Sequence, residues 1–105
     1  MKSPIEHLLR NRDRLSIMAG ILEVALNGSL KTQIIYKANL SFAQSNRYLA
    51  LLLDLKLLEV VENSERKVFK TTNKGMRFVQ SHQEIHEFLE KETHATLKES
   101  EFSKP

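Results

Sequence analysis

The sequence contains no cysteine, no tryptophan, three glycines and two prolines in 105 residues. Without cysteine the chain can form neither a disulfide nor a thiolate metal site, which is compatible with a reducing compartment. No apolar run approaches the roughly 20 residues of a membrane helix. Residues 1–7 lack the apolar core of a signal peptide. We therefore expect a soluble, cytoplasmic protein.

The composition is that of an ordinary globular chain, with 41% hydrophobic and 28% charged residues. A chain of this length accommodates one domain with an appendage. The net charge of +3 is unevenly distributed, because residues 31–81 carry +5 and residues 82–105 carry −3. A basic module is typical of a polyanion partner, whereas an acidic helical tail is not suited to lie along phosphates.

Apolar residues at three- and four-residue spacing predict a helix from Arg12 to Leu26. The residues from Lys2 to Asn11 either extend this helix from Pro4 or fray. Asn27-Gly28 is expected to end this helix, since both residues accept the left-handed conformation found just past a helix end. The expected apolar stripe consists of Leu15, Met18, Ala19, Leu22, Ala25 and Leu26.

A helix-turn-helix pattern follows. Thr32 is a plausible N-cap for a short helix over Gln33–Ala38, and Asn39-Leu40 is the break. Ser41 with Gln44 three residues later is a capping-box pattern that starts the next helix. The inward face of that helix is expected to carry Leu49, Leu52 and Leu53.

Two β-prone runs, 57–62 and 67–72, flank the turn residues 63–66 and predict a hairpin. Ser29-Leu30-Lys31 is long enough only for a small edge strand. Residues 72–75 open a last, long helix. The order of elements predicts a mainly α fold with a small β-hairpin (α+β), the winged helix-turn-helix. The expected divisions are a domain over residues 1–75 with an N-terminal extension, a dimerisation helix over 76–98 and a flexible tail over 99–105.

Docking of such a module places the first turns of its second helix against base edges and surrounding side chains against phosphates. We expect DNA contact from that helix, from the wing tip and, on weaker grounds, from the preceding short helix. The candidate residues are Ser41, Gln44, Ser45, Arg47 and Tyr48 in the helix, Arg66 and Lys67 in the wing, and Lys31, Gln33 and Lys37 before them. The alternatives are a solvated polar helix face and a hairpin charged for solubility.

The last helix carries more apolar residues than packing on a small domain requires, which favours a two-fold dimer. The expected dimerisation residues form two seams, Phe78, His82, Ile85 and Leu89, and the weaker Val79 and His86. The alternative is that this helix folds back on its own domain.

Few residues suggest other chemistry. His82 and His86 share a helix face at a spacing that can chelate a metal, but neither cysteine nor a recognised carboxylate motif accompanies them. No glycine-rich phosphate loop, nucleophile elbow or diagnostic Ser/His/Asp spacing is present. We expect no metal, no cofactor and no enzymatic activity.

The segments 32–41, 48–53, 57–59 and 69–75 closely resemble the small archaeal winged-helix DNA-binding proteins that dimerise through a C-terminal antiparallel coiled coil. The resemblance covers about residues 15–89, and its pattern Thr-x-Ile-x-Tyr-x-Ala-Asn-Leu is fairly specific. It implies a dimeric, cofactor-free DNA-binding protein that contacts DNA through residues matching Gln44, Ser45, Arg47, Tyr48, Arg66 and Lys67. Two departures are Lys56, where such helices usually end in glycine, and a shorter C-terminal seam interrupted by histidines.

The sequence thus predicts a homodimeric DNA-binding transcriptional regulator associated with the nucleoid. Two alternatives remain open, a chromatin protein that binds DNA without sequence preference and a winged-helix module that binds another protein.

Overall fold

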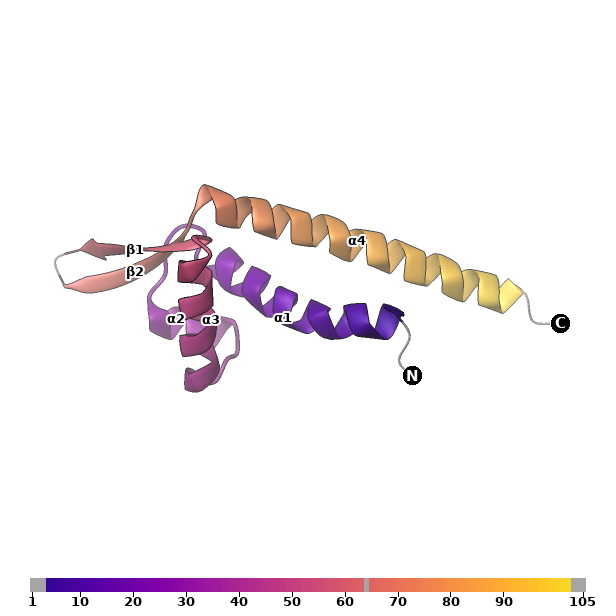
Figure 1. The fold of residues 1–105 in the computed structure, drawn as a ribbon, viewed down its shortest axis with the longest axis horizontal. Helices are drawn as coiled ribbons and strands as arrows, with labels where there is room; N and C mark the ends of the chain where they lie inside the picture. Colours follow the sequence, from indigo (N-terminus) through magenta and orange to yellow (C-terminus); the bar gives the residue numbers. More distant parts are fainter. Residues whose placement is uncertain (1–3, 64, 103–105) are drawn as a thin grey trace.

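A computed structural model describes the backbone of residues 4–63 and 65–102 and the side chains of residues 14–63 and 65–92. Three helices precede a two-stranded hairpin, and a long helix follows it (Figure 1). The elements are α1 (Pro4–Val24), α2 (Lys31–Lys37), α3 (Phe42–Asp54), β1 (Leu58–Asn63), β2 (Arg66–Thr71) and α4 (Asn73–Phe102). The predicted fold class is confirmed. None of the helices in the described part of the chain has the length and apolar character to cross a membrane.

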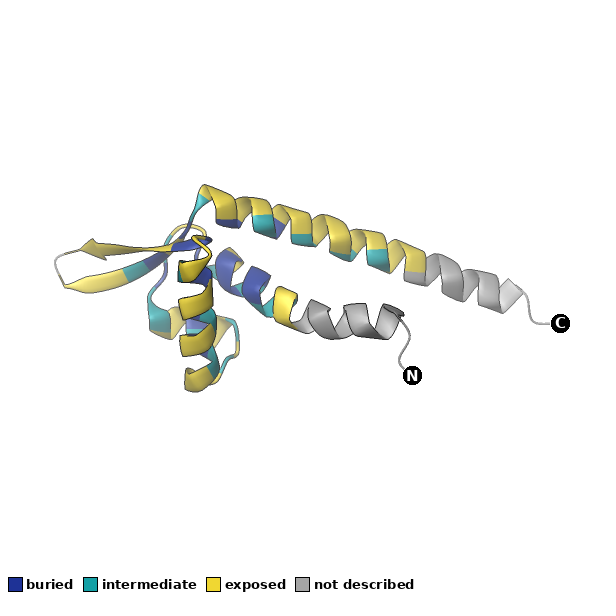
Figure 2. Cartoon of the chain, viewed as in Figure 1, coloured by how far each residue is buried: buried dark blue, intermediate teal, exposed yellow. Residues whose placement is uncertain are grey.

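The core gathers the inner faces of α1, α2 and α3 with the base of the hairpin and the start of α4 (Figure 2). On α1 the predicted stripe is partly wrong, since Leu15 and Leu26 are exposed at its margins and Ile21, which it omitted, is fully buried. The buried apolar residues are Met18, Ala19, Ile21, Leu22, Ala25, Ile34, Leu49, Leu52, Leu57, Leu58, Phe69 and Val79.

The ends of the first three helices follow local chemistry. Gly28 has φ +94° in the connection after α1, as its place in the sequence predicts. The predicted N-cap of α2 is wrong, because Leu30 rather than Thr32 occupies that position. The side-chain oxygen of Gln33 accepts the Leu30 backbone N–H at 3.0 Å, which satisfies one of the donors left open at a helix start.

The helices α2 and α3 both end in a left-handed residue. Asn39 has φ +54° and Lys56 has φ +60°. At each end the residue after the left-handed one donates to a carbonyl five positions earlier, from Leu40 to Ile35 at 3.0 Å and from Leu57 to Leu52 at 2.9 Å. This is the Schellman pattern, in which glycine is the usual left-handed residue. Lys56 therefore adopts a conformation that disfavours a side chain, at the position where helices of the archaeal proteins that the sequence resembles usually end in glycine.

The hairpin pairs β1 with β2 in antiparallel register, from Leu58 opposite Thr71 to Asn63 opposite Arg66. Only its base is packed, since β1 is exposed after Leu58 (Figure 2). The short edge strand predicted before α2 is present as a single bridge between Ser29 and Phe69. The Thr71 hydroxyl donates to the Leu22 carbonyl at 2.7 Å in a buried hydrogen bond, which fixes β2 to α1.

The last helix begins after Thr72, whose hydroxyl accepts the Gly75 N–H at 3.0 Å. It then runs back along α1 in the opposite direction (Figure 1). The helix α4 continues to Phe102, four residues beyond the predicted boundary at residue 98, and includes part of the expected tail. Residues 103–105 of that tail, like residues 1–3 of the N-terminal extension, lie outside the described residues.

Candidate nucleic-acid interface

The start of α3 is held by two of the predicted contact residues. The Ser41 hydroxyl accepts the Gln44 N–H at 3.1 Å, and the Gln44 side-chain oxygen accepts the Ser41 N–H at 3.0 Å. The predicted capping box is therefore confirmed. Ser41 is exposed and Gln44 is half-buried. Because the side-chain oxygen of Gln44 accepts the Ser41 N–H, its amide nitrogen is the group left for contact with a ligand.

The predicted interface is wrong at Ser45, which is buried. Its exposed fraction is 0%, and its hydroxyl donates to the Phe42 carbonyl at 2.7 Å. It shares the buried face of α3 with Leu49 and Leu52. A side chain without accessible surface cannot reach DNA in this conformation, so Ser45 is a packing residue rather than a contact residue.

The outward face of α3 carries one cation. Arg47 is exposed and Tyr48 is half-buried against the core. Asn46, which the sequence analysis did not single out, is also exposed. An Arg and an Asn are side chains that pair with guanine and adenine edges in the major groove. The rest of this face is largely apolar, consisting of Phe42, Ala43, Ala50, Leu51, Asp54 and Leu55.

Lys31 connects α2 to this face. Its ammonium group donates to the side-chain oxygen of Asn46 and lies 4.5 Å from the centre of the Phe42 ring. The cation and the ring attract each other, although Phe42 is 66% exposed. Lys31 thus orients the first turns of α3, and its charge remains at the interface.

The other predicted residues of α2 have different surroundings. Gln33 is exposed but uses its side-chain oxygen to cap the helix. Lys37 is exposed at the end of the helix. Tyr36 lies beside it and is 86% exposed, which is unusual for a large aromatic side chain. Tyr36 is a second residue that the sequence analysis did not list for this surface.

The hairpin tip places Arg66 and Lys67 in the solvent, as expected. Glutamates accompany them, because the register sets Glu62 opposite Lys67 and Glu59 opposite Lys70. A hollow of about 260 Å³ at the tip is lined by Glu62, Asn63, Glu65, Arg66 and Lys67. Acidic and basic residues are equally numerous over 58–71. The positive excess of the module therefore lies outside the hairpin.

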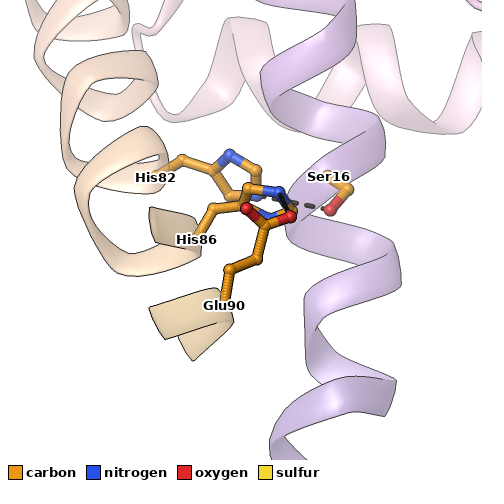
Figure 3. Close-up of polar contacts among 4 residues, drawn as sticks. All are labelled: Ser16, His82, His86 and Glu90. Atoms are coloured by element: carbon orange, nitrogen blue, oxygen red, sulfur yellow. Dashed lines mark hydrogen bonds and ion pairs between the residues drawn. The ribbon is translucent and has the colours of Figure 1, made fainter. Parts of the chain in front are cut away.

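Part of the predicted dimerisation seam is used within the chain. Val79 belongs to the core, and Phe78 packs against it. The side chains of Ser16 and His82 share a hydrogen bond of 3.3 Å between α1 and α4, and His86 Nε2 lies 2.8 Å from Glu90 Oε1 (Figure 3). Val79 is therefore a core residue rather than a dimer contact, which corrects its predicted role, whereas the half-buried Phe78 leaves its role in a dimer a prediction.

Other residues of α4 remain open to a partner. Ile85 is 55% exposed and Phe88 is 61% exposed, whereas Leu89 is half-buried. The rings of His82 and His86 stack with their centres 6.1 Å apart. Within the described residues, no three His, Cys, Asp or Glu side chains converge in a way that could hold a metal ion.

A family model described as "winged helix-turn-helix" matches residues 11–90, which is most of the chain. The chain belongs to the winged helix-turn-helix family. In its terms α2 and α3 form the helix-turn-helix, with α3 as the recognition helix, and β1–β2 is the wing. The comparison with curated proteins gives no match.

Solved structures of other winged-helix proteins are similar to this one. Sso10a-2, a DNA-binding protein from Sulfolobus solfataricus, is 25% identical with a TM-score of 0.78, over 87% of this chain and 96% of that chain. MepR, a transcription regulator of the Staphylococcus aureus multidrug efflux pump MepA, is 14% identical with a TM-score of 0.67, over 96% and 87%. ZitR from Lactococcus lactis is 21% identical with a TM-score of 0.57, over 86% and 60%. The last two likenesses show a common fold alone.

Proposed function

We propose that this winged-helix protein is a DNA-binding transcriptional regulator that inserts α3 into the major groove. The observation that carries the proposal is the exposed pair Asn46 and Arg47 on the recognition helix of a module with this fold. Lys31 and Lys37 on α2 add positive charge at the edge of the same surface. The description of the similar Sso10a-2 as a DNA-binding protein supports the assignment.

The wing has the secondary role in this proposal. Its tip reaches the adjacent backbone or minor groove through Arg66 and Lys67, while Glu62 and Glu65 weaken the attraction to phosphates. The affinity for DNA therefore comes mainly from the helix-turn-helix, and the wing mainly fixes orientation.

We also propose that the protein acts as a homodimer, without catalytic activity. Ile85 and Phe88 stand exposed on a helix whose other side already packs on α1. Pairing of this outer face with the same face of a second copy removes both side chains from water. A two-fold axis through α4 presents two recognition helices to successive turns of the duplex. Such a dimer would be found on the nucleoid.

A second candidate function is a protein-interaction module. The outward face of α3 carries exposed Phe42, Leu51 and Leu55 next to a single arginine, and the wing has no net charge. A partner protein with an apolar groove suits this surface as well. The two functions differ in their response to salt, because phosphate contacts weaken steeply as salt rises and apolar contacts do not.

The deciding experiment is binding to a mixed-sequence duplex by fluorescence anisotropy across a salt series, with the mass measured by light scattering in the same buffers. Salt-sensitive binding by a dimer supports the proposal. Competition with unrelated DNA then separates a specific regulator from a chromatin protein that ignores sequence. A folded protein that binds no duplex at low salt contradicts the proposal and favours a protein partner.

A further inference from the structure

A hollow on the α1 side of the recognition helix brings two arginines together. It has a volume of about 330 Å³ and is lined by Arg14 of α1 and by Arg47, Tyr48 and Leu51 of α3. Both arginines are exposed, and Tyr48 is half-buried, with its ring packed against the core. The hollow is therefore lined by two positively charged side chains, a tyrosine and a leucine.

Among the side chains that the structure describes, no carboxylate neutralises the charge in this hollow. Neither arginine forms an ion pair with a carboxylate among the described side chains. Asp54, the one acidic residue of α3, does not line the hollow. Two guanidinium groups that face one space repel each other, and an anion between them removes that repulsion.

The position of the hollow relates it to the DNA surface. In Figure 1 the hairpin projects from one side of α3 and α1 extends from the other. Arg14, the residue of α1 that lines the hollow, lies on the α1 side of the recognition helix. A duplex whose major groove receives α3 has a phosphate backbone on each side of that groove.

We infer that Arg14 and Arg47 together bind a phosphate group, with the Tyr48 hydroxyl as a further donor, and that this group is a backbone phosphate of the bound duplex. Guanidinium groups suit this ligand because their planar donors match phosphate oxygens in pairs. The identity of the phosphate as DNA rests on the proposed function, whereas the affinity of the hollow for phosphate does not. In this arrangement Arg14 contacts the phosphate backbone on one side of the major groove. The wing tip contacts the duplex on the other side of α3.

The test uses the full chain and three proteins, namely wild type, Arg14→Gln and Lys91→Gln. Lys91 is an exposed cation of α4 that does not line the hollow, so its substitution matches the loss of charge. Duplex affinity is measured by anisotropy over a salt series. A parallel NMR titration with inorganic phosphate follows the side-chain Nε–H signals of Arg14 and Arg47, and circular dichroism checks the fold.

Loss of one phosphate contact lowers the slope of log affinity against log salt by about 0.9 per protomer. We expect this loss for Arg14→Gln, no change for Lys91→Gln, and shifts of both arginine signals on adding phosphate to the wild type. Shifts without any duplex binding by the wild type support the phosphate site, assign it to a free phosphorylated ligand and refute the DNA part of the inference. An unchanged slope in a folded Arg14→Gln protein that still binds duplex overturns the assignment to DNA. Silent arginine signals overturn the phosphate site itself.

Discussion

Ser29 and Phe69 exchange two backbone hydrogen bonds of 2.8 Å each, so the connection between α1 and α2 is paired with the second strand of the wing. The pairing joins segments that are distant in the sequence. With the buried bond from Thr71 to Leu22, it holds the base of the hairpin against α1. The direction in which the wing leaves the domain is therefore set by the core rather than by the hairpin itself.

Gly75 allows α4 to begin close to the end of α3. A Cβ atom at this position would lie 2.2 Å from the Leu57 carbonyl oxygen and 2.7 Å from the Thr71 side chain. Gly75→Ala should lower the free energy of unfolding by about 1–3 kcal/mol, because the backbone must move to admit the methyl group. Urea denaturation measures this change. Gly20→Ala is the control, since nothing lies within 4 Å of its Cβ and helix propensity should make it more stable by about 0.5–1 kcal/mol. Equal effects of the two substitutions would contradict the close contact.

Lys56 occupies a left-handed position that glycine would fill with less strain. Lys56→Gly should raise the free energy of unfolding by about 0.5–1 kcal/mol, the strain relieved less the additional entropy of an unfolded glycine. Its carbonyl still accepts the Thr72 hydroxyl after substitution, because that bond uses only the backbone. Thermal unfolding and urea denaturation check the result. Lys56→Ala retains the Cβ and should not raise the free energy of unfolding in this way. An equal increase would show that the effect comes from removal of the positive charge.

Arg47 is the only cation on the recognition helix. Arg47→Ala should weaken duplex binding by about 1.5–3 kcal/mol, the range of one hydrogen-bonded contact to a charged group, and should leave folding intact because the side chain is exposed. Anisotropy titrations at fixed salt give the affinity, and circular dichroism reports the fold. Unaltered affinity in the folded variant would exclude the outward face of α3 from the DNA surface.

The wing gives a separate prediction. The double substitution Arg66→Ala and Lys67→Ala should reduce duplex affinity by less than Arg47→Ala, because Glu62 and Glu65 already offset the charge at the tip. The same titrations compare the two variants. If the folded double variant binds as tightly as the wild type, the wing takes no part in binding.

Phe88 tests the dimer. Phe88→Asp should shift the mass measured by light scattering from dimer to monomer, since a carboxylate is costly to bury in an apolar helix pair. The side chain is 61% exposed within one chain, so the domain itself should stay folded. Glu87→Ala, at the neighbouring exposed position, serves as the control and should remain dimeric. A dimeric Phe88→Asp protein would place the interface elsewhere.

Local signals in the sequence predicted the elements well. The capping box at Ser41 and Gln44, the glycine after α1 and the two β-prone runs each depend on residues close together in the chain, and all three are present in the structure. The cap of α2 shows the limit of such signals. Thr32 has the chemistry of an N-cap, but the N-cap position falls two residues earlier, at Leu30, whose backbone N–H donates to the Gln33 side chain.

The rotation of α3 was only partly predicted. Leu49 and Leu52 were placed on the inward face, and extending that spacing back by one turn reaches Ser45, which is buried. This spacing in the sequence indicates that Ser45 faces inward, whereas the polarity of serine suggests that it faces solvent. The bond from Lys31 to Asn46 and the hollow between Arg14 and Arg47 depend on how separate helices pack, which spacing along one helix does not encode.

The packing of α4 on α1 was predicted least well. A heptad-like spacing shows that a helix has an apolar seam, but the seam can face its own domain or a second copy equally well. The contacts of Val79 and His82 with the domain assign the inner stripe to intramolecular packing.

The base of the hairpin is buried and its tip is exposed, so the base determines the direction of the wing and the tip determines its length. Its base is fixed by Ser29, Phe69 and Thr71, whereas the tip around Asn63 and Arg66 packs on nothing within the described chain. Residue pairs can therefore be inserted or removed at the tip without disturbing the core. Insertions at the tip would therefore change how far the wing reaches along a partner, while its orientation relative to the domain stays the same.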